Sequence, residues 1–172
     1  MRRPDPTQIF ALAAEFMVVV PTLVLFAVIY ADDLRTTLWE IGGNKGWNSD
    51  PRLRIYFYAN HREPPEIPFI WSQRLTDSVL AIAMLGVAVW LARFTLLYFG
   101  ATMARINAVY DILLSGLWTY AVVAQSSGDF SDPEHPCSRP WYLEKSCTQV
   151  GSQNRGACVA AKVSFFLALL AM

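Results

Sequence analysis

Charge is confined to parts of this chain, and that separation constrains the fold more than any other feature. Four stretches, at about 9–30, 77–99, 105–125 and 157–172, are nearly free of charged residues. Charged residues make up 16% of the 172 positions, against about 25% in a typical soluble domain. A helix needs about 20 apolar residues to cross a bilayer, whose hydrocarbon does not solvate charge. The pattern therefore predicts an integral membrane protein.

We expect one domain, 1–172, folded as an all-α four-helix transmembrane bundle whose spans are the four apolar stretches. Only a few residues separate the stretches at 77–99 and 105–125, so their helices must be antiparallel neighbours. Gly100 favours a turn there over one continuous long helix. The loops at about 31–76 and 126–156 then lie on one side of the membrane.

The first and last stretches each leave an alternative open. Arg2 and Arg3 precede the first stretch and would suit a signal peptide, but its long apolar core and Glu15 favour a retained span. The last stretch has 16 residues and rises only about 24 Å as a helix, short of a hydrocarbon core about 30 Å thick. We expect either that the sequence continues past Met172 or that this end is short, tilted or interfacial.

The first loop contains a stretch at 52–58 that alternates partly and is rich in β-forming residues. This pattern predicts a short strand or hairpin, which Pro64 and Pro68 would end. Trp71 and Trp141 fall near the predicted span ends, where tryptophan commonly anchors a protein in the membrane interface.

Besides Lys162 in the last stretch, three charged residues lie inside the apolar stretches: Glu15, Arg93 and Asp111. Helix rise places all three within about 6–12 Å of the same membrane face. Charged groups inside membranes usually face the protein interior and form pairs. We therefore expect an ion-pair clasp between helices, and a proton or ion path is the alternative. Lys162 lies near the opposite face, where it can snorkel outward.

The three cysteines, Cys137, Cys147 and Cys158, allow three single disulfides. We favour Cys147–Cys158, which closes a short loop onto the last span, over Cys137–Cys147. No C-x-x-C motif is present, which argues against a thiol oxidoreductase.

The side of the membrane on which the loops lie follows from the cysteines rather than from positive charge. A disulfide needs an oxidising compartment, which places the loops outside and both termini in the cytosol, in the plasma membrane or an endomembrane. The Lys/Arg distribution leaves the orientation open, because both sides of the membrane carry cations. Arg2, Arg3 and Arg105 lie in short segments on one side, and six cations of the long first loop lie on the other. These six are Arg35, Lys45, Arg52, Arg54, Arg62 and Arg74.

Asp129, Asp132, Glu134 and His135 form an acidic run in the second loop. Their oxygens suit a hard cation, but the spacing matches no EF-hand, and we favour ordinary turn chemistry. No Ser-His-Asp arrangement, nucleotide loop or HExxH motif is present. We therefore predict no catalytic residue, metal or cofactor. The formal net charge is zero and no Lys/Arg run exists, which argues against a nucleic-acid partner.

Small residues repeat every four positions at Ala160, Ser164 and Ala168, and again at Ala104 and Ala108. This spacing lets membrane helices approach closely, although chance in an alanine-rich chain is the alternative. The first set predicts a helix-packing face on the last span.

Several short motifs follow one another in the second half of the chain. They are Tyr110-Asp111, Leu117-Trp118, 125–135, 140–143, Cys147, 155–158 and Ala161-Lys162. In this combination they resemble fungal four-span proteins of the MARVEL-like group over about residues 75–172, while the N-terminal third agrees in layout only. The resemblance implies a four-helix bundle with cytosolic termini and a role in membrane apposition, vesicle trafficking or lateral organisation. It supplies no catalytic residues.

These observations together predict a membrane-organising or trafficking-associated tetraspan scaffold, not an enzyme, that acts through lateral helix contacts. Its expected partners are membrane lipids, further copies of itself and other membrane proteins. An accessory subunit of a larger membrane complex is the alternative, and a small transporter or channel built on the charge cluster is a more distant one.

Overall fold

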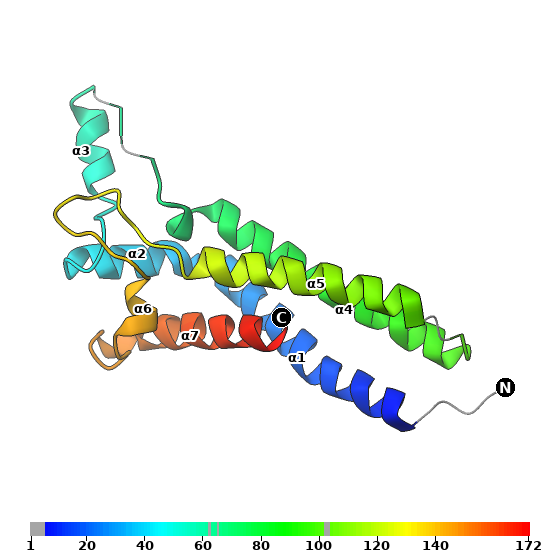
Figure 1. Ribbon diagram of the computed structural model, residues 1–172. Helices are drawn as coiled ribbons and strands as arrows, with labels where there is room; N and C mark the ends of the chain where they lie inside the picture. The colour runs from blue at the N-terminus through cyan, green and yellow to red at the C-terminus, as the bar shows by residue number, and fades with distance from the viewer. Residues whose placement is uncertain (1–5, 62, 65, 102–103) are drawn as a thin grey trace.

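The computed structural model describes residues 6–61, 63, 64, 66–101 and 104–172, and every regular element within them is helical (Figure 1). Arg2, Arg3 and Arg62, whose charges enter the orientation argument, lie outside the described residues. The elements are α1 (Pro6–Ala31), α2 (Leu34–Asn44), α3 (Leu53–Ala59), η1 (Phe69–Trp71), α4 (Gln73–Tyr98), α5 (Ala104–Gln125), α6 (Trp141–Glu144), η2 (Ser152–Asn154) and α7 (Arg155–Leu170).

Three of these helices, α1, α4 and α5, are long and apolar enough to cross a membrane. They contain 26, 26 and 22 residues, so each exceeds the length that a crossing needs. This indicates a membrane protein. The fourth predicted span, α7, has 16 residues and rises about 24 Å. Its length alone does not establish a crossing.

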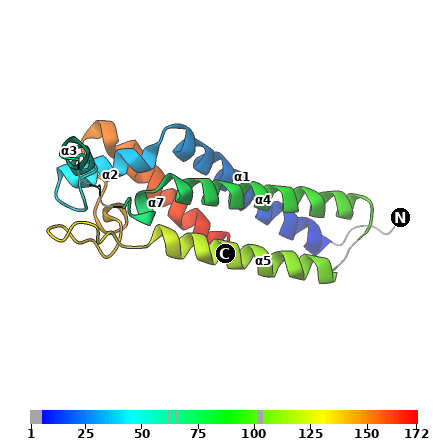
Figure 2. The same cartoon turned by 90° about the horizontal axis from the view of Figure 1, so that it is seen from above.

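The turn after α4 has a helix-ending geometry that the glycine makes possible. Gly100 adopts a left-handed conformation with φ of 71°. Its N–H bonds to the Leu97 carbonyl at 3.0 Å, and the next N–H, of Ala101, reaches back to Leu96 at 2.9 Å. This pair of bonds is the Schellman pattern that closes a helix. The chain reverses here, and α5 runs back beside α4 (Figure 2).

The long helices pack in a chain of neighbours, with α1 against α4 and α4 against α5. Helix α7 packs against both α1 and α5. In both views the C-terminus lies about midway along α5 (Figures 1 and 2). The described part of α7 therefore lies beside α1 and α5 over the half nearer the loops.

The predicted strand at 52–58 is wrong, because this segment forms helix α3. Asp50 and Pro51 start the helix: the Asp50 carboxylate accepts the N–H of Arg52 at 2.9 Å, and proline suits a first helical turn. A lone strand would leave its N–H and C=O groups unpaired, whereas a helix satisfies them internally. No partner strand lies within the described residues to change that balance.

The two loops fold together into one unit, which we call the cap: residues 32–72 and 126–154. Its buried side chains merge with those at the loop-side ends of the long helices. Trp71 and Trp141 are 3% and 1% exposed, so the expected place for them in the membrane interface is wrong. A buried indole needs an acceptor for its N–H, and the cap supplies one to each.

Candidate functional site

The structure brings together Glu15, Arg93 and Asp111, the three charged residues of the predicted clasp, from three apolar helices. Arg93 of α4 donates from Nη1 to Oε1 of Glu15 on α1 at 2.9 Å, and from Nη2 to Oδ1 of Asp111 on α5. Nη2 also lies 3.3 Å from the carbonyl oxygen of Asn107. One guanidinium therefore ties α1 and α5 to the helix between them, as its fork of donors allows.

A second polar contact joins α1 and α4 close to the clasp. The indole N–H of Trp90 donates to the Leu12 carbonyl at 2.9 Å, and the Trp90 ring lies 4.9 Å from that of Phe16, centroid to centroid. Because the continuous apolar core lies toward the cap, these polar contacts hold the hairpin-side half of the helices together.

Two cavities adjoin the clasp and share its three charged residues. The larger, of about 490 Å³, runs toward the cap and is lined mainly by apolar side chains. The smaller, of about 180 Å³, runs toward the hairpin turn and is lined also by Gln8 and Asn107. We call the two together the groove. The larger cavity is lined by Ala14, Glu15, Val18, Val19, Ala83, Gly86, Arg93, Asp111, Leu114, Ser115, Trp118, Leu170, Ala171 and Met172.

The three charges differ in exposure. The side chains of Arg93 and Glu15 are 14% and 24% exposed, whereas that of Asp111 is 63% exposed. In the described chain, Nε of Arg93 and Oδ1 of Asn107 are buried without a hydrogen-bond partner. The clasp is therefore asymmetric, because the helices enclose Arg93 and Glu15 but leave the Asp111 carboxylate open.

A second polar centre, in the cap, surrounds Asp129, which is 1% exposed. Its Oδ2 accepts from the indole N–H of Trp71 at 2.9 Å and from the hydroxyl and N–H of Ser49 at 2.6 and 3.3 Å. Its Oδ1 accepts from the hydroxyl and N–H of Ser131 at 2.8 and 3.1 Å. Five neutral donors thus satisfy one buried carboxylate and join the two loops.

The first loop supports this centre through a further set of bonds. The hydroxyl of Ser49 also accepts from the Trp39 indole at 2.9 Å. Asn48 donates to the carbonyls of Trp39 and Ser49 at 3.2 and 2.8 Å. A Cβ on Gly42 would lie 1.5 Å from Oδ1 of Asn48, so only glycine fits there. The side chains of this hydrogen-bond network therefore pack directly against the backbone of Gly42.

Two further hydrogen-bonding side chains, Trp141 of α6 and Arg35 of α2, join elements of the cap. The indole N–H of Trp141 donates to the Leu38 carbonyl at 3.0 Å. Arg35 is 6% exposed and donates to the Ile70 carbonyl at 3.0 Å. Burial lowers the pKa of Arg35 and raises the pKa of Tyr142, while the hydrogen bond between these two side chains opposes both changes.

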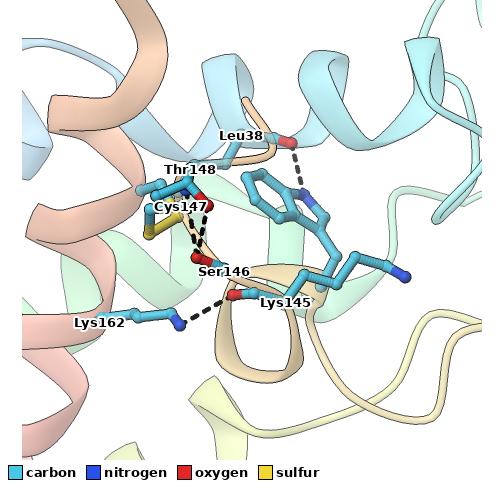
Figure 3. The surroundings of a disulfide bond; sticks show 8 residues. Leu38, Lys145, Ser146, Cys147, Thr148 and Lys162 are labelled. Atoms are coloured by element: carbon cyan, nitrogen blue, oxygen red, sulfur yellow. Dashed lines mark hydrogen bonds between the residues drawn. A yellow bond between two sulfur atoms is a disulfide. The ribbon is translucent and has the colours of Figure 1, made fainter. Parts of the chain in front are cut away.

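The structure joins Cys147 to Cys158 by a disulfide with a Cα–Cα distance of 5.7 Å, which ties the cap to the first turn of α7 (Figure 3). Beside it, Nζ of Lys162 donates to the Lys145 carbonyl at 2.8 Å. Cys137 is a free, buried cysteine, and burial raises the pKa of its thiol.

The small residues of α7 are placed on the side that faces α1 and α5. Ser164 and Ala168 are 2% and 0% exposed, and Ala160 lies half-buried at the edge of that face. Ala104 and Ala108 on α5 are exposed. Within the chain, close packing of small residues therefore concerns α7 rather than the start of α5.

The acidic run of the second loop does not converge on one point. Asp129 faces the cap core, whereas Asp132 accepts from the Glu134 N–H at 3.0 Å and from Nδ1 of His135 at 3.1 Å, as in an ordinary turn. Among the described residues, no group of three or more His, Cys, Asp or Glu side chains is placed to hold a metal ion.

The core role of Asp129 escaped the sequence reasoning, which grouped it with its acidic neighbours. A usable signal was present: four tryptophans, Trp39, Trp47, Trp71 and Trp141, lie in segments too polar to be spans. Each buried indole N–H requires an acceptor, and a carboxylate in the facing loop is an obvious one.

A comparison of the chain with protein-family models, curated proteins and solved structures found no match.

Proposed function

We propose that the protein is a four-pass membrane organiser that acts through lateral helix contacts in the bilayer and not as an enzyme. The observation that carries this proposal is the outward face of α5. Only 11% of the most apolar 18-residue stretch of α5 is buried within the protein. Its exposed apolar residues include Ile112, Leu113, Leu117, Tyr120 and Val123.

Within that face, Gly116 is open: nothing lies within 4 Å of a Cβ built on it. A glycine on an exposed membrane helix allows a second helix to approach closely. The outward face of α5 thus offers both the apolar surface and the close-approach point that lateral association needs.

The fourth crossing in this proposal is α7. Its buried small residues pack against the neighbouring helices, and the disulfide at its first turn fixes where it leaves the cap. Since α7 has 16 residues and ends about midway along α5, its crossing in this proposal requires the bilayer to thin around its C-terminal end, which costs a fraction of a kcal/mol per Å of mismatch. Because the disulfide belongs to an oxidising compartment, the cap lies outside and both termini lie in the cytosol. The resemblance to MARVEL-like four-span proteins supports the same layout and the same role.

Single-molecule photobleaching in bilayers tests the proposal. We expect the wild-type chain to form dimers or larger oligomers, and Gly116→Leu to shift it toward monomers because the added side chain blocks close approach. Gly151→Leu is the matched control, since Gly151 lies in the cap and is equally open. A wild-type chain that stays monomeric at all densities contradicts the proposal.

A second candidate, an accessory subunit of a membrane complex, is favoured by α3. This helix has no buried residue, and Leu53, Ile55, Tyr56 and Tyr58 on it are 47–70% exposed outside the membrane spans. Apolar side chains gathered on a water-facing element commonly mark a protein contact. If this candidate holds, a partner co-purifies at fixed stoichiometry and is lost in the double variant Ile55→Ser, Tyr56→Ser. Retention of the same partner by that variant counts against it.

A further inference from the structure

We propose that the cap carries a binding site for a phosphate monoester, formed by Lys45, Trp47, His135 and Lys145. We call these four residues the basic corner. Lys45 and Trp47 directly follow the last residue of α2, His135 lies in the second loop, and Lys145 ends α6. The ligand is defined by its phosphate group, whether that group belongs to a soluble molecule or to a lipid head. The proposal concerns the cap and does not depend on lateral association.

The basic corner brings two ammonium groups to one aromatic ring. Nζ of Lys45 lies 5.7 Å from the centroid of the Trp47 ring, and Nζ of Lys145 lies 5.0 Å from it. The two nitrogens are therefore no further apart than the sum of these distances. Contact with the ring favours each ammonium, whereas the repulsion between their like charges opposes the arrangement. A bound anion removes this opposition.

The backbone on both sides of the corner is held in place. The N–H of Trp47 donates to the Gly42 carbonyl at 2.9 Å, and its ring lies 5.3 Å from that of Trp141, centroid to centroid. The N–H of Lys145 donates to the Trp141 carbonyl at 2.8 Å, and its carbonyl accepts from Nζ of Lys162 at 2.8 Å. In Figure 3 the Lys145 side chain extends away from Lys162. Its ammonium is therefore directed to a different place from that of Lys162.

The second loop closes one side of the corner. Gly46 has a φ of 65°, and a Cβ built on it would lie 3.3 Å from both Cδ2 and Nε2 of His135. The absence of a side chain there lets the imidazole lie against the turn between Lys45 and Trp47. Nδ1 of His135 donates to Oδ2 of Asp132 at 3.1 Å, because an ionised carboxylate only accepts. Asp132 is therefore paired with the histidine and not with a lysine.

The donors of the corner have no acceptor within the part of the chain that the structure describes. None of the ion pairs among those residues includes Lys45 or Lys145. None of those residues accepts a hydrogen bond from either ammonium or from the Trp47 indole N–H. Ammonium and indole groups donate and do not accept. The corner therefore selects a ligand that is rich in acceptors and negatively charged.

A phosphate monoester matches these groups in charge and in hydrogen bonding. It carries a charge of about −1.5 to −2 at pH 7 and three strong acceptor oxygens, which suit two ammonium groups and one indole N–H. A phosphodiester or a carboxylate carries less charge. Lysine binds phosphate as a point charge, whereas bidentate recognition of a carboxylate commonly uses arginine. The flexible stems of the two lysines let both ammonium groups reach one phosphate.

NMR of the full chain with isotope-labelled tryptophan, in lipid-free non-ionic detergent, tests the proposal. The indole signal of Trp47 is identified by its loss in Trp47→Phe. One arm compares methyl phosphate with dimethyl phosphate, and the other compares phosphatidic acid with phosphatidylglycerol, both added to the micelles. We expect the Trp47 signal to shift saturably with the monoester in at least one arm. The monoester should bind about fivefold more tightly than its diester, as expected for one additional charge contact at an exposed site.

Two variants test the lysines directly. Lys45→Gln and Lys145→Gln should each weaken binding of the monoester about fivefold, and the double variant should lose saturable binding. Arg74→Gln, which removes an exposed cation at the start of α4, is the matched control and should bind as wild type does. Unchanged indole signals of Trp39 and Trp71, which are hydrogen-bonded in the cap core, show that each variant is folded.

The two arms also separate the sources of the phosphate. Binding of methyl phosphate supports the proposal with a soluble ligand, and binding of phosphatidic acid alone supports it with a lipid head. Equal affinity for monoester and diester in both arms overturns it, and so does the absence of a saturable shift in either arm. Wild-type affinity in the double variant also overturns it, because the phosphate then binds elsewhere. None of these measurements depends on association between chains, so failure of this proposal and failure of lateral association give different results.

Discussion

The indole nitrogen of Trp71 donates a 2.9 Å hydrogen bond to Oδ2 of Asp129, 58 positions further along the chain. This bond joins the end of the first loop to the start of the second, immediately before α4 and immediately after α5. It therefore closes the cap over the loop-side ends of the two helices that form the hairpin.

Asp129→Asn should destabilise the cap. In the variant, an amide nitrogen replaces one of the two acceptor oxygens and lies against donors of Ser49 or Ser131. At least one buried donor is then left without an acceptor, which lowers the free energy of unfolding by about 1–3 kcal/mol. The thermal midpoint in detergent, followed by tryptophan fluorescence, measures the loss. Glu134→Gln, an exposed acid in the same loop, is the control. Equal midpoints for the two variants would show that the buried network contributes nothing.

The disulfide predicts a thiol count. Denatured but unreduced protein should react with maleimide once, at Cys137, and reduced protein three times. In the folded protein Cys137 should react slowly, because it is buried. Reduction should cost about 3 kcal/mol or less for so short a loop. Three reactive thiols without reductant, in protein prepared under oxidising conditions, would contradict the pairing.

Arg93→Leu should destabilise the protein by about 3 kcal/mol, because it leaves two carboxylates without their cation. Glu15→Gln should cost less, since Arg93 keeps Asp111. Unfolding in mixed detergent micelles measures both, with Arg74→Gln, an exposed arginine at the start of α4, as the control. Normal stability in Arg93→Leu together with loss of an ion flux would point to an ion path instead of a clasp.

The cap should lose stability at alkaline pH through Tyr142. Burial raises the pKa of Tyr142 above its ordinary value of 10.0, and Arg35 opposes part of that rise. The neutral hydroxyl therefore stabilises the fold fully below pH 10, and this contribution is lost as the pH rises toward the folded-state pKa. The fall in thermal midpoint between about pH 9 and about pH 11 should be smaller in Tyr142→Phe than in wild type. An identical fall in both proteins contradicts the prediction.

Local patterns identified the long helices but misread the first loop. Charge-free runs predicted helices at α1, α4 and α5 because length and hydropathy alone decide whether a segment can cross a bilayer. Residues 52–58 have β-forming side chains, yet they form a helix because the preceding Asp50-Pro51 starts one and the described residues contain no strand to pair with them. Strand propensity depends on neighbours, and a single segment does not specify them.

The candidate site was predicted unevenly for the same reason. Helix rise was enough to place Glu15, Arg93 and Asp111 at one depth, because depth along a membrane helix is a linear count. It was not enough to show that Asp111 stays 63% exposed or that a groove adjoins it. Those properties depend on how α1, α4 and α5 pack against one another, which spacing along a single helix does not specify.

The sequence by itself determined that this protein has helices able to cross a membrane, that its charges inside them lie at one level, and that its cysteines lie in or beside the second loop. Each of these properties is local, since it depends on spacing along one chain segment. Only the tertiary structure decided that Asp129 is a buried acceptor rather than a surface acid, that Trp71 and Trp141 are in the cap core, and that one guanidinium bonds to carboxylates of two other helices. These depend on contacts between residues tens of positions apart, and such contacts exist only once the loops fold against each other.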